Sequence, residues 1–198
     1  MDRLLLPFLR DRRDVATHVR STLLRSSIES LRAQGLGARY EAALAPAARD
    51  DVLECVAGVW MPMSLGLAHY TACEALGLTT EQQEGQGQQV GERLHGAMLG
   101  VVVRAARGAG VTPWALLGRM DLLWERMFQG GAGPSLVQAG PKDARVELVG
   151  LPLLAIPYVR RAFRGIFRAG LQTLSTKVYV VEVPVPGATS AMYRVSWA

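Results

Sequence analysis

The residues of this sequence that are best suited to chemistry are three histidines, His18, His69 and His95. Imidazole is a common metal ligand and general base, and three imidazoles can hold a catalytic zinc ion. These three fall on separate predicted helices, where a histidine more often satisfies its own local hydrogen bonds. Glu92 and His95 have the Glu-x-x-His spacing of di-iron bundles, but the second such motif is missing. We therefore predict no metal, no cofactor and no catalytic residue.

Two other segments resemble catalytic motifs only in part. The glycine-rich stretch 85–91 follows no predicted strand, and its spacing is neither a dinucleotide fingerprint nor a phosphate-binding loop. Residues 63–66, Met-Ser-Leu-Gly, give half of a nucleophile elbow, with Pro62 where a glycine belongs. We interpret Gly85, Gly87 and Gly91 as places where another helix approaches closely or where their own helix frays. The sequence predicts a protein that binds without catalysing.

Arginines form a stripe on the predicted helix 152–174. Arg160, Arg164 and Arg168 recur every four residues with Arg161 beside them, and apolar residues cover the other side. Guanidinium groups bind phosphates and carboxylates in bidentate geometry. The stripe is therefore a candidate contact for an anion or an acidic partner, and a solvated helix face is the alternative.

A second set of candidates is aromatic or polarizable and lies at predicted helix starts or on apolar faces. Such residues usually fill a core, yet an aromatic-lined cavity between helices and a sheet would be a natural ligand pocket. The residues predicted to line it are Trp60, His69, Cys73, His95, Trp114, Trp124 and Tyr158.

Length and composition indicate one globular domain. The chain has 198 residues, of which 49% are hydrophobic and 20% are charged, enough for one sizeable core. Cys55 and Cys73 belong to no Cys-x-x-Cys pair and are predicted to be reduced. The apolar run 4–9 is too short for a secretion signal, and the run 97–103 is far too short for a membrane span. We expect a cytoplasmic location.

The net charge of +5 is spread unevenly. Residues 1–39 hold eight arginines and four acids, residues 40–110 hold four arginines and eight acids, and residues 111–198 hold ten basic residues and five acids. An acidic middle between basic ends suggests internal complementarity or a charged partner surface rather than nucleic-acid binding.

Hydrophobic periodicity predicts an α+β fold in which an N-terminal helical bundle packs on a C-terminal antiparallel β-sheet with a β-α-β-β ending. We expect a single domain, 1–198, made of a helical part, 1–79, and a core, 80–198. Predicted helices cover residues 14–36, 63–76, 80–107, 113–128 and 152–174, and predicted strands cover 144–151, 177–185 and 191–197.

The order of motifs in residues 80–197 carries a family resemblance. Its carriers are residues 116–128 with the glycine-rich loop 130–133, residues 141–147, Tyr158, Gly165 and residues 193–197. In this order they resemble the haem-nitric-oxide-binding-like superfamily, which includes four-vinyl-reductase sensor domains and transport-protein-particle subunits. The resemblance is closest to a myxobacterial paralogous family of unknown function.

The resemblance also implies which ligand to expect. In the haem-binding members a histidine before the glycine-rich loop ligates iron, and the matching position here is Trp124. The Tyr-x-Ser-x-Arg motif that holds the haem propionates in those members is missing from residues 148–152. The resemblance thus implies a pocket without haem, suited to a hydrophobic small molecule or acyl chain, and a homodimer.

Three functions follow from these observations. The first is a cytoplasmic, homodimeric sensor-like or adaptor domain that has lost haem ligation and holds an apolar ligand or a protein partner. The second is an enzyme or accessory protein of a biosynthetic pathway that uses the apolar pocket for its substrate. The third is a scaffold that docks an acidic partner through the arginine stripe.

Overall fold

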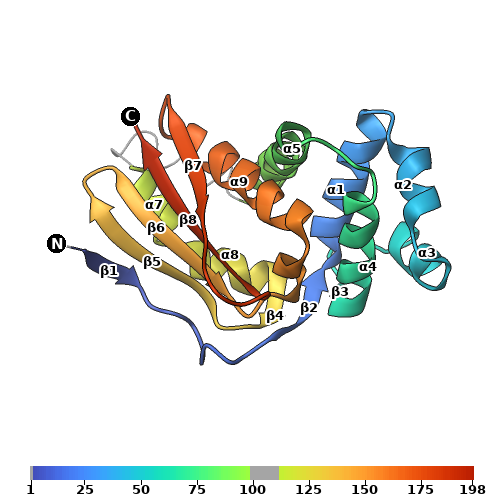
Figure 1. The fold of residues 1–198 in the computed structure, drawn as a ribbon, viewed down its shortest axis with the longest axis horizontal. Helices are drawn as coiled ribbons and strands as arrows, with labels where there is room; N and C mark the ends of the chain where they lie inside the picture. Colours follow the sequence, from blue (N-terminus) through green and yellow to red (C-terminus); the bar gives the residue numbers. More distant parts are fainter. Residues whose placement is uncertain (1, 99–111) are drawn as a thin grey trace.

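The computed structural model describes residues 2–98 and 112–198, and the backbone alone for residues 94–98. Figure 1 shows a β-sheet at one end of the molecule, a group of helices at the other end, and two helices, α5 and α9, between them. The first half of the chain forms β1 (Arg3–Leu6), β2 (Ala16–Arg20), α1 (Ser21–Ala33), α2 (Gly37–Ala43), α3 (Pro46–Leu53), β3 (Trp60–Pro62), α4 (Met63–Glu74) and α5 (Thr80–Met98). The second half forms α7 (Pro113–Leu117), α8 (Met120–Met127), β4 (Phe128–Gly130), β5 (Gly133–Gly140), β6 (Asp143–Val149), the 3-10 helix η1 (Pro152–Ala155), α9 (Pro157–Gln172), β7 (Val178–Val183) and β8 (Ser190–Trp197).

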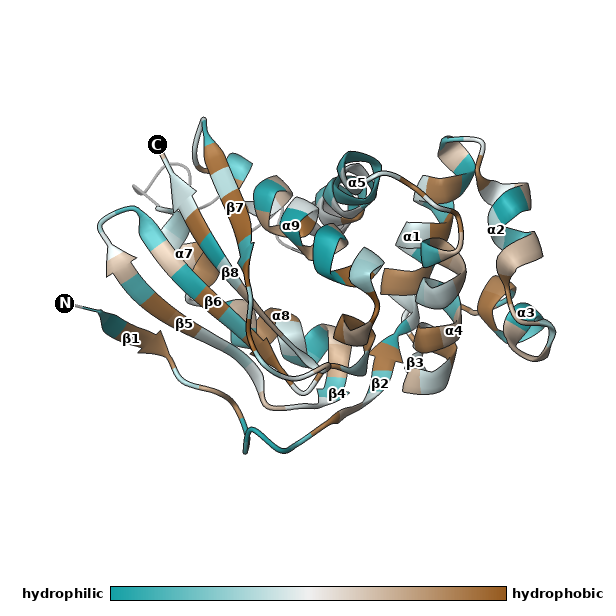
Figure 2. Ribbon diagram, in the orientation of Figure 1, coloured by the Kyte–Doolittle hydropathy of each residue, from teal (hydrophilic) through white to brown (hydrophobic). Residues whose placement is uncertain are grey.

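The larger sheet is antiparallel, with strand order β1-β5-β6-β8-β7. Hydrophilic and hydrophobic residues alternate along β6 and β8, so that each strand has one apolar face (Figure 2). Val146 of β6 pairs with Tyr193 of β8, and both are fully buried. Tyr193 in turn packs on Phe167 of α9, with ring centroids 5.2 Å apart. The inner face of the sheet therefore forms a core with α9.

A smaller sheet, β3-β2-β4, joins the two ends of the molecule. Its central strand, β2, pairs with β3 through Val19 and Met61 and with β4 through Val19 and Phe128. All three of these residues are buried. This small sheet connects the helical group α1–α4 to the segment that enters β5.

Helices α5 and α9 cross in close contact, and glycines permit it. A Cβ on Gly87 of α5 would overlap the carbonyl oxygen of Ala162 in α9, and a Cβ on Gly165 of α9 would overlap the carbonyl oxygen of Glu84 in α5. A Cβ on Gly91 would lie 2.9 Å from the Cβ of Ala169. The helix-packing interpretation of Gly87 and Gly91 is therefore confirmed, whereas Gly85 has open space beside it.

The α+β class of the fold and its β-α-β-β ending, formed by β6, α9, β7 and β8, are confirmed. The prediction of one helix over residues 14–36 is wrong, because residues 16–20 form the central strand of the small sheet. His18 accordingly lies on β2 and not on a helix.

Two other predicted helices are interrupted. Residues 113–128 form two helices, α7 and α8, and the first ends where Gly118 caps it. Residues 152–174 form η1 and then α9, which begins at Pro157 because proline fits the first turn of a helix but not its interior. The predicted helix 80–107 begins as predicted at Thr80 and is described to Met98, so its last part lies outside the described residues.

The sequence did not indicate β1, β3, β4 or β5. Strand β5 begins with a glycine and a proline, and its first four residues are all buried, so it lacks the alternation of a strand with one exposed face. Among the helices described, none is long and apolar enough to cross a membrane.

The glycines of α5 provide a test of the helix crossing. We expect Gly87→Ala to lower the free energy of unfolding by roughly 1–3 kcal/mol, because its methyl group would force α5 and α9 apart. Gly85→Ala is the matched control and should raise stability by about 1 kcal/mol, since alanine favours a helix and has room there. Urea unfolding followed by circular dichroism measures both, and equal effects would contradict the glycine contact.

Candidate functional site

A cavity of about 150 Å³ lies among α7, α8, α9 and the inner face of the larger sheet. Its volume matches that of cavities that stay dry and accept benzene. Its walls are apolar and partly aromatic, and they come from both halves of the chain. The lining residues are Leu23, Tyr70, Gly91, Leu116, Leu117, Met120, Leu123, Trp124, Met127, Phe128, Pro134, Leu148, Leu153, Val159, Ala162, Phe163, Ile166, Phe167, Gly170 and Leu171.

Helical spacing places these side chains on one wall. Met120, Leu123, Trp124 and Met127 are separated by three or four residues on α8, and so face the same side of that helix. On α9 the same spacing brings Val159, Ala162, Phe163, Ile166, Phe167 and Gly170 to the cavity. The apolar side of α9 that the sequence predicted is therefore a wall of the cavity.

Trp124 is the lining residue at the position that the family resemblance singles out. Its side chain is 4% exposed, and its ring lies 4.9 Å from that of Phe128. The indole Nε1 donates a hydrogen bond of 3.0 Å to the carbonyl oxygen of Gly130. That bond satisfies the single donor of the indole, which leaves only its apolar surface for the cavity.

Tyr70 of α4 supplies the one hydroxyl group among the described lining residues. The residue is 6% exposed, and its ring packs against those of His69 and Tyr158. Burial, and secondarily the nearby Cys73, raise the pKa of the phenol above its ordinary value. Tyr70 is therefore a neutral phenol in an apolar wall.

A buried polar cluster lies behind Tyr70. Nδ1 of His69 is 2.5 Å from the hydroxyl of Tyr40, and Nε2 is 3.7 Å from Sγ of Cys73. Burial lowers the pKa of His69 to about 3 and raises the pKa of the Cys73 thiol. Because thiolate is the reactive form of cysteine, this thiol is inert at neutral pH. The cluster is uncharged and well suited to a structural role.

The other residues predicted for the pocket occupy different places. The guanidinium carbon of Arg20 lies over the ring of Trp60, 4.2 Å from the ring centroid. Trp114 packs against Trp197. Tyr158 borders a second cavity of about 20 Å³ next to Tyr70. His69 and Cys73 lie in the polar cluster, and His95 lies on α5 with its side chain outside the described residues.

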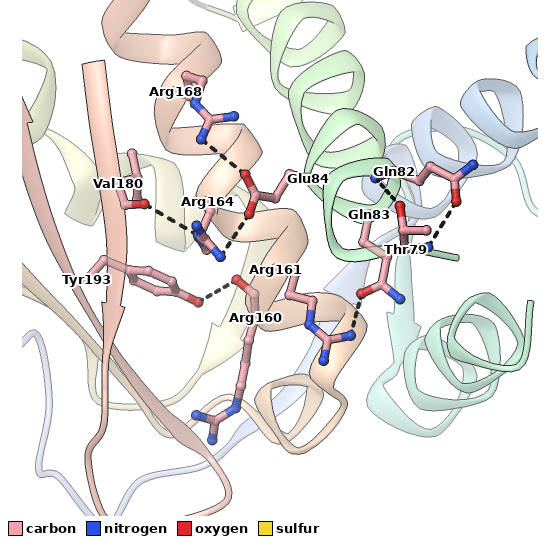
Figure 3. A network of polar contacts seen from close by, with 10 residues as sticks. All are labelled: Thr79, Gln82, Gln83, Glu84, Arg160, Arg161, Arg164, Arg168, Val180 and Tyr193. Atoms are coloured by element: carbon pink, nitrogen blue, oxygen red, sulfur yellow. Dashed lines mark hydrogen bonds and ion pairs between the residues drawn. The ribbon is translucent and has the colours of Figure 1, made fainter. Parts of the chain in front are cut away.

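The arginine stripe of α9 is engaged within the molecule (Figure 3). Arg164 and Arg168 both bind the carboxylate of Glu84 on α5, at 2.8 and 3.1 Å. Arg161 donates to Oε1 of Gln83 at 2.8 Å, and Arg160 pairs with Glu182 of β7 at 3.0 Å. These bonds hold α9 to both neighbours. An anion or partner contact for the same arginines stays a prediction.

Comparison with protein-family models finds no match, and comparison with curated proteins finds no relative. Solved structures of H-NOX domains are similar in fold. One, determined to probe haem distortion in the H-NOX family, has a TM-score of 0.63 and 13% identity over 90% of this chain and 94% of that chain. A mutant of T. Tengcongensis H-NOX gives 0.62 and 14% over 90% and 97%. An oxygen-binding H-NOX domain related to soluble guanylate cyclases gives 0.60 and 13% over 90% and 94%.

These similarities show that the chain has the α+β fold of H-NOX domains. The likeness in structure covers 90% of the chain, and so extends beyond residues 80–197, where the motifs resemble the family. The sequence places Tyr70 among the aromatic residues on apolar helix faces but does not single it out for the pocket, because helix α4 has no strongly polar side that would fix the direction of its side chains.

The buried imidazole of His69 makes a prediction about acid stability. The pKa of His69 is lowered from 6.5 to about 3 by burial, so between these values the unfolded chain binds a proton that the folded chain does not. Stability should therefore fall as the pH falls through this range, and His69 alone should account for about 2 kcal/mol between pH 7 and pH 5. His69→Gln removes the titration, and its unfolding free energy should depend less on pH. Parallel pH profiles for the two proteins, measured by urea unfolding, would refute this assignment.

Proposed function

We propose that this protein is a non-catalytic, sensor-like or adaptor domain that binds an apolar small molecule in the cavity beside Trp124. The observation that carries the proposal is the cavity itself. The space measures about 150 Å³, and its described walls are hydrocarbon. A ligand that fits it gains van der Waals contacts with those walls and removes apolar surface from water.

Haem is the group studied in two of the similar structures. The described lining of this cavity does not fit it, because it contains no imidazole or thiolate for iron and no cation for the propionates. Its two thioethers, Met120 and Met127, are the sole soft donors there, and the volume matches benzene rather than a porphyrin. We therefore propose a ligand other than haem.

Binding is favoured over catalysis by the same walls. A substrate pocket of an enzyme would be expected to hold a group such as His69, His95 or Glu92. His69 and Glu92 do not line the cavity, and the side chain of His95 lies outside the described residues. The scaffold hypothesis is less well supported, since three arginines of the stripe already form ion pairs with Glu84 and Glu182 of the same chain. A homodimer, a cytoplasmic location and kinship with the myxobacterial family stay predictions.

Toluene provides a direct test, because it has the size and polarity of the cavity. We expect isothermal titration calorimetry to detect its binding to the wild type. Leu123→Trp fills the cavity from α8 and should weaken binding roughly tenfold or more. Leu122→Trp is the control, since Leu122 is 49% exposed and does not line the cavity. Failure of the wild type to bind toluene, or an equal loss in both variants, would contradict the proposal.

The exclusion of haem has its own test. After incubation with stoichiometric haemin and gel filtration, we expect the protein to show no Soret absorption band. Leu123→Trp serves again as the control, because haem adsorbed to the surface would remain in that variant. A band that is present in the wild type and absent from Leu123→Trp would show that the cavity takes haem.

A further inference from the structure

We infer that the ligand of the cavity carries a single hydroxyl or carbonyl oxygen, which hydrogen-bonds to Tyr70. The inference rests on the proposed function and adds a chemical class to it: a small, mostly apolar molecule, the size of one aromatic ring, with one polar group. It follows from the hydrogen-bonding state of Tyr70, from its place between two cavities, and from the neutrality of its surroundings.

The hydroxyl of Tyr70 has no hydrogen-bond partner in the part of the chain that the structure describes. Other buried tyrosines do have partners: the Tyr40 hydroxyl meets His69, and Tyr193 donates to the carbonyl oxygen of Arg160. The side chain of Tyr70 is 6% exposed, so bulk water does not reach it freely. Buried polar groups are nearly always paired, and an unpaired one needs an explanation. A ligand with one oxygen supplies the missing partner.

Tyr70 lies between two cavities of the molecule. Tyr70 borders both the large cavity and the small cavity of about 20 Å³. The small cavity has room for one water molecule. Its polar neighbours are already engaged, since the Gln86 amide bonds Ser30 and Gln34, and Ser27 bonds Cys73. A water molecule in the small cavity would be the alternative to a ligand oxygen as partner of the Tyr70 hydroxyl.

The surroundings also restrict the charge of the ligand. No charged side chain is among the described lining residues, and the cluster behind Tyr70 is neutral. A charged ligand would lose its hydration without gaining a counter-ion. A neutral oxygen loses less, and one hydrogen bond to a neutral phenol compensates it.

Phenol and toluene are the probes, because they have the same number of heavy atoms and differ in one hydroxyl group. Binding of each is measured by calorimetry to the wild type, Tyr70→Phe and Tyr158→Phe. The quantity compared is the ratio of the two dissociation constants, in which the hydration of each probe cancels between proteins. We expect Tyr70→Phe to shift this ratio roughly tenfold against phenol and to leave toluene binding unchanged.

Tyr158→Phe is the matched control. It removes the same atom, a phenol oxygen, from a ring whose centroid is 6.1 Å from that of Tyr70. The Tyr158 hydroxyl interacts with Ser27 and Cys73, and Tyr158 does not line the large cavity. We expect it to leave the probe ratio unchanged and to lower the unfolding midpoint. Tyr70→Phe should not lower the midpoint, because the hydroxyl it removes has no partner among the described residues.

The outcomes are distinguishable. If toluene binds and Tyr70→Phe leaves the ratio unchanged, the assigned ligand class is wrong while the proposed function stands. If Tyr70→Phe lowers the unfolding midpoint of the ligand-free protein, water in the small cavity already binds the hydroxyl, and the inference is wrong. If neither probe binds the wild type, the proposed function itself fails.

Discussion

The crossing of α5 and α9 is the contact on which the rest of the structure depends. Its glycines bring two backbones into direct contact, which no other residue type at Gly87 or Gly165 would allow. Glu84 then reaches two arginines of the facing helix at 2.8 and 3.1 Å. Small residues of α9, such as Gly165 and Ala169, face α5, and the larger Phe163 and Phe167 of α9 lie on the side of the sheet residue Tyr193. Phe163 and Phe167 also line the cavity.

The cavity and the polar cluster behind it are two consequences of the same burial. Tyr40, His69, Cys73 and Tyr158 are enclosed so completely that desolvation keeps each of them neutral. Hydrogen bonds among neutral groups satisfy the cluster without introducing a charge. The wall that meets a ligand therefore differs from an active site, where perturbed groups are usually poised to exchange protons. Here the perturbation moves each pKa away from neutrality and makes the groups inert.

The sequence predicts features that repeat locally and misses features that depend on distant partners. The two sides of α9 and the packing glycines of α5 follow from helical spacing. The strand β2 could not be found in this way, because its five residues acquire their identity from pairing with β3 and β4. The pairing of Arg164 and Arg168 with Glu84 joins residues 80 or more positions apart, and charge counts indicated only that the ends and the middle of the chain were complementary. The role of Tyr70 depends on which side chains reach its hydroxyl group. The spacing of residues along the sequence does not encode that.

The separation of scaffold from lining explains how one fold can serve different ligands. The ion pairs of Glu84 with Arg164 and Arg168, and the pairing of Val146 with Tyr193, involve residues that do not line the cavity. Trp124 illustrates this separation: its indole hydrogen bond goes to Gly130 at the end of β4, and its ring lies beside that of Phe128. A side chain anchored to the scaffold in this way changes the shape and chemistry of the cavity without changing the fold. Function therefore has to be argued from the lining, and in this protein the described lining combines hydrocarbon walls with one tyrosine, Tyr70.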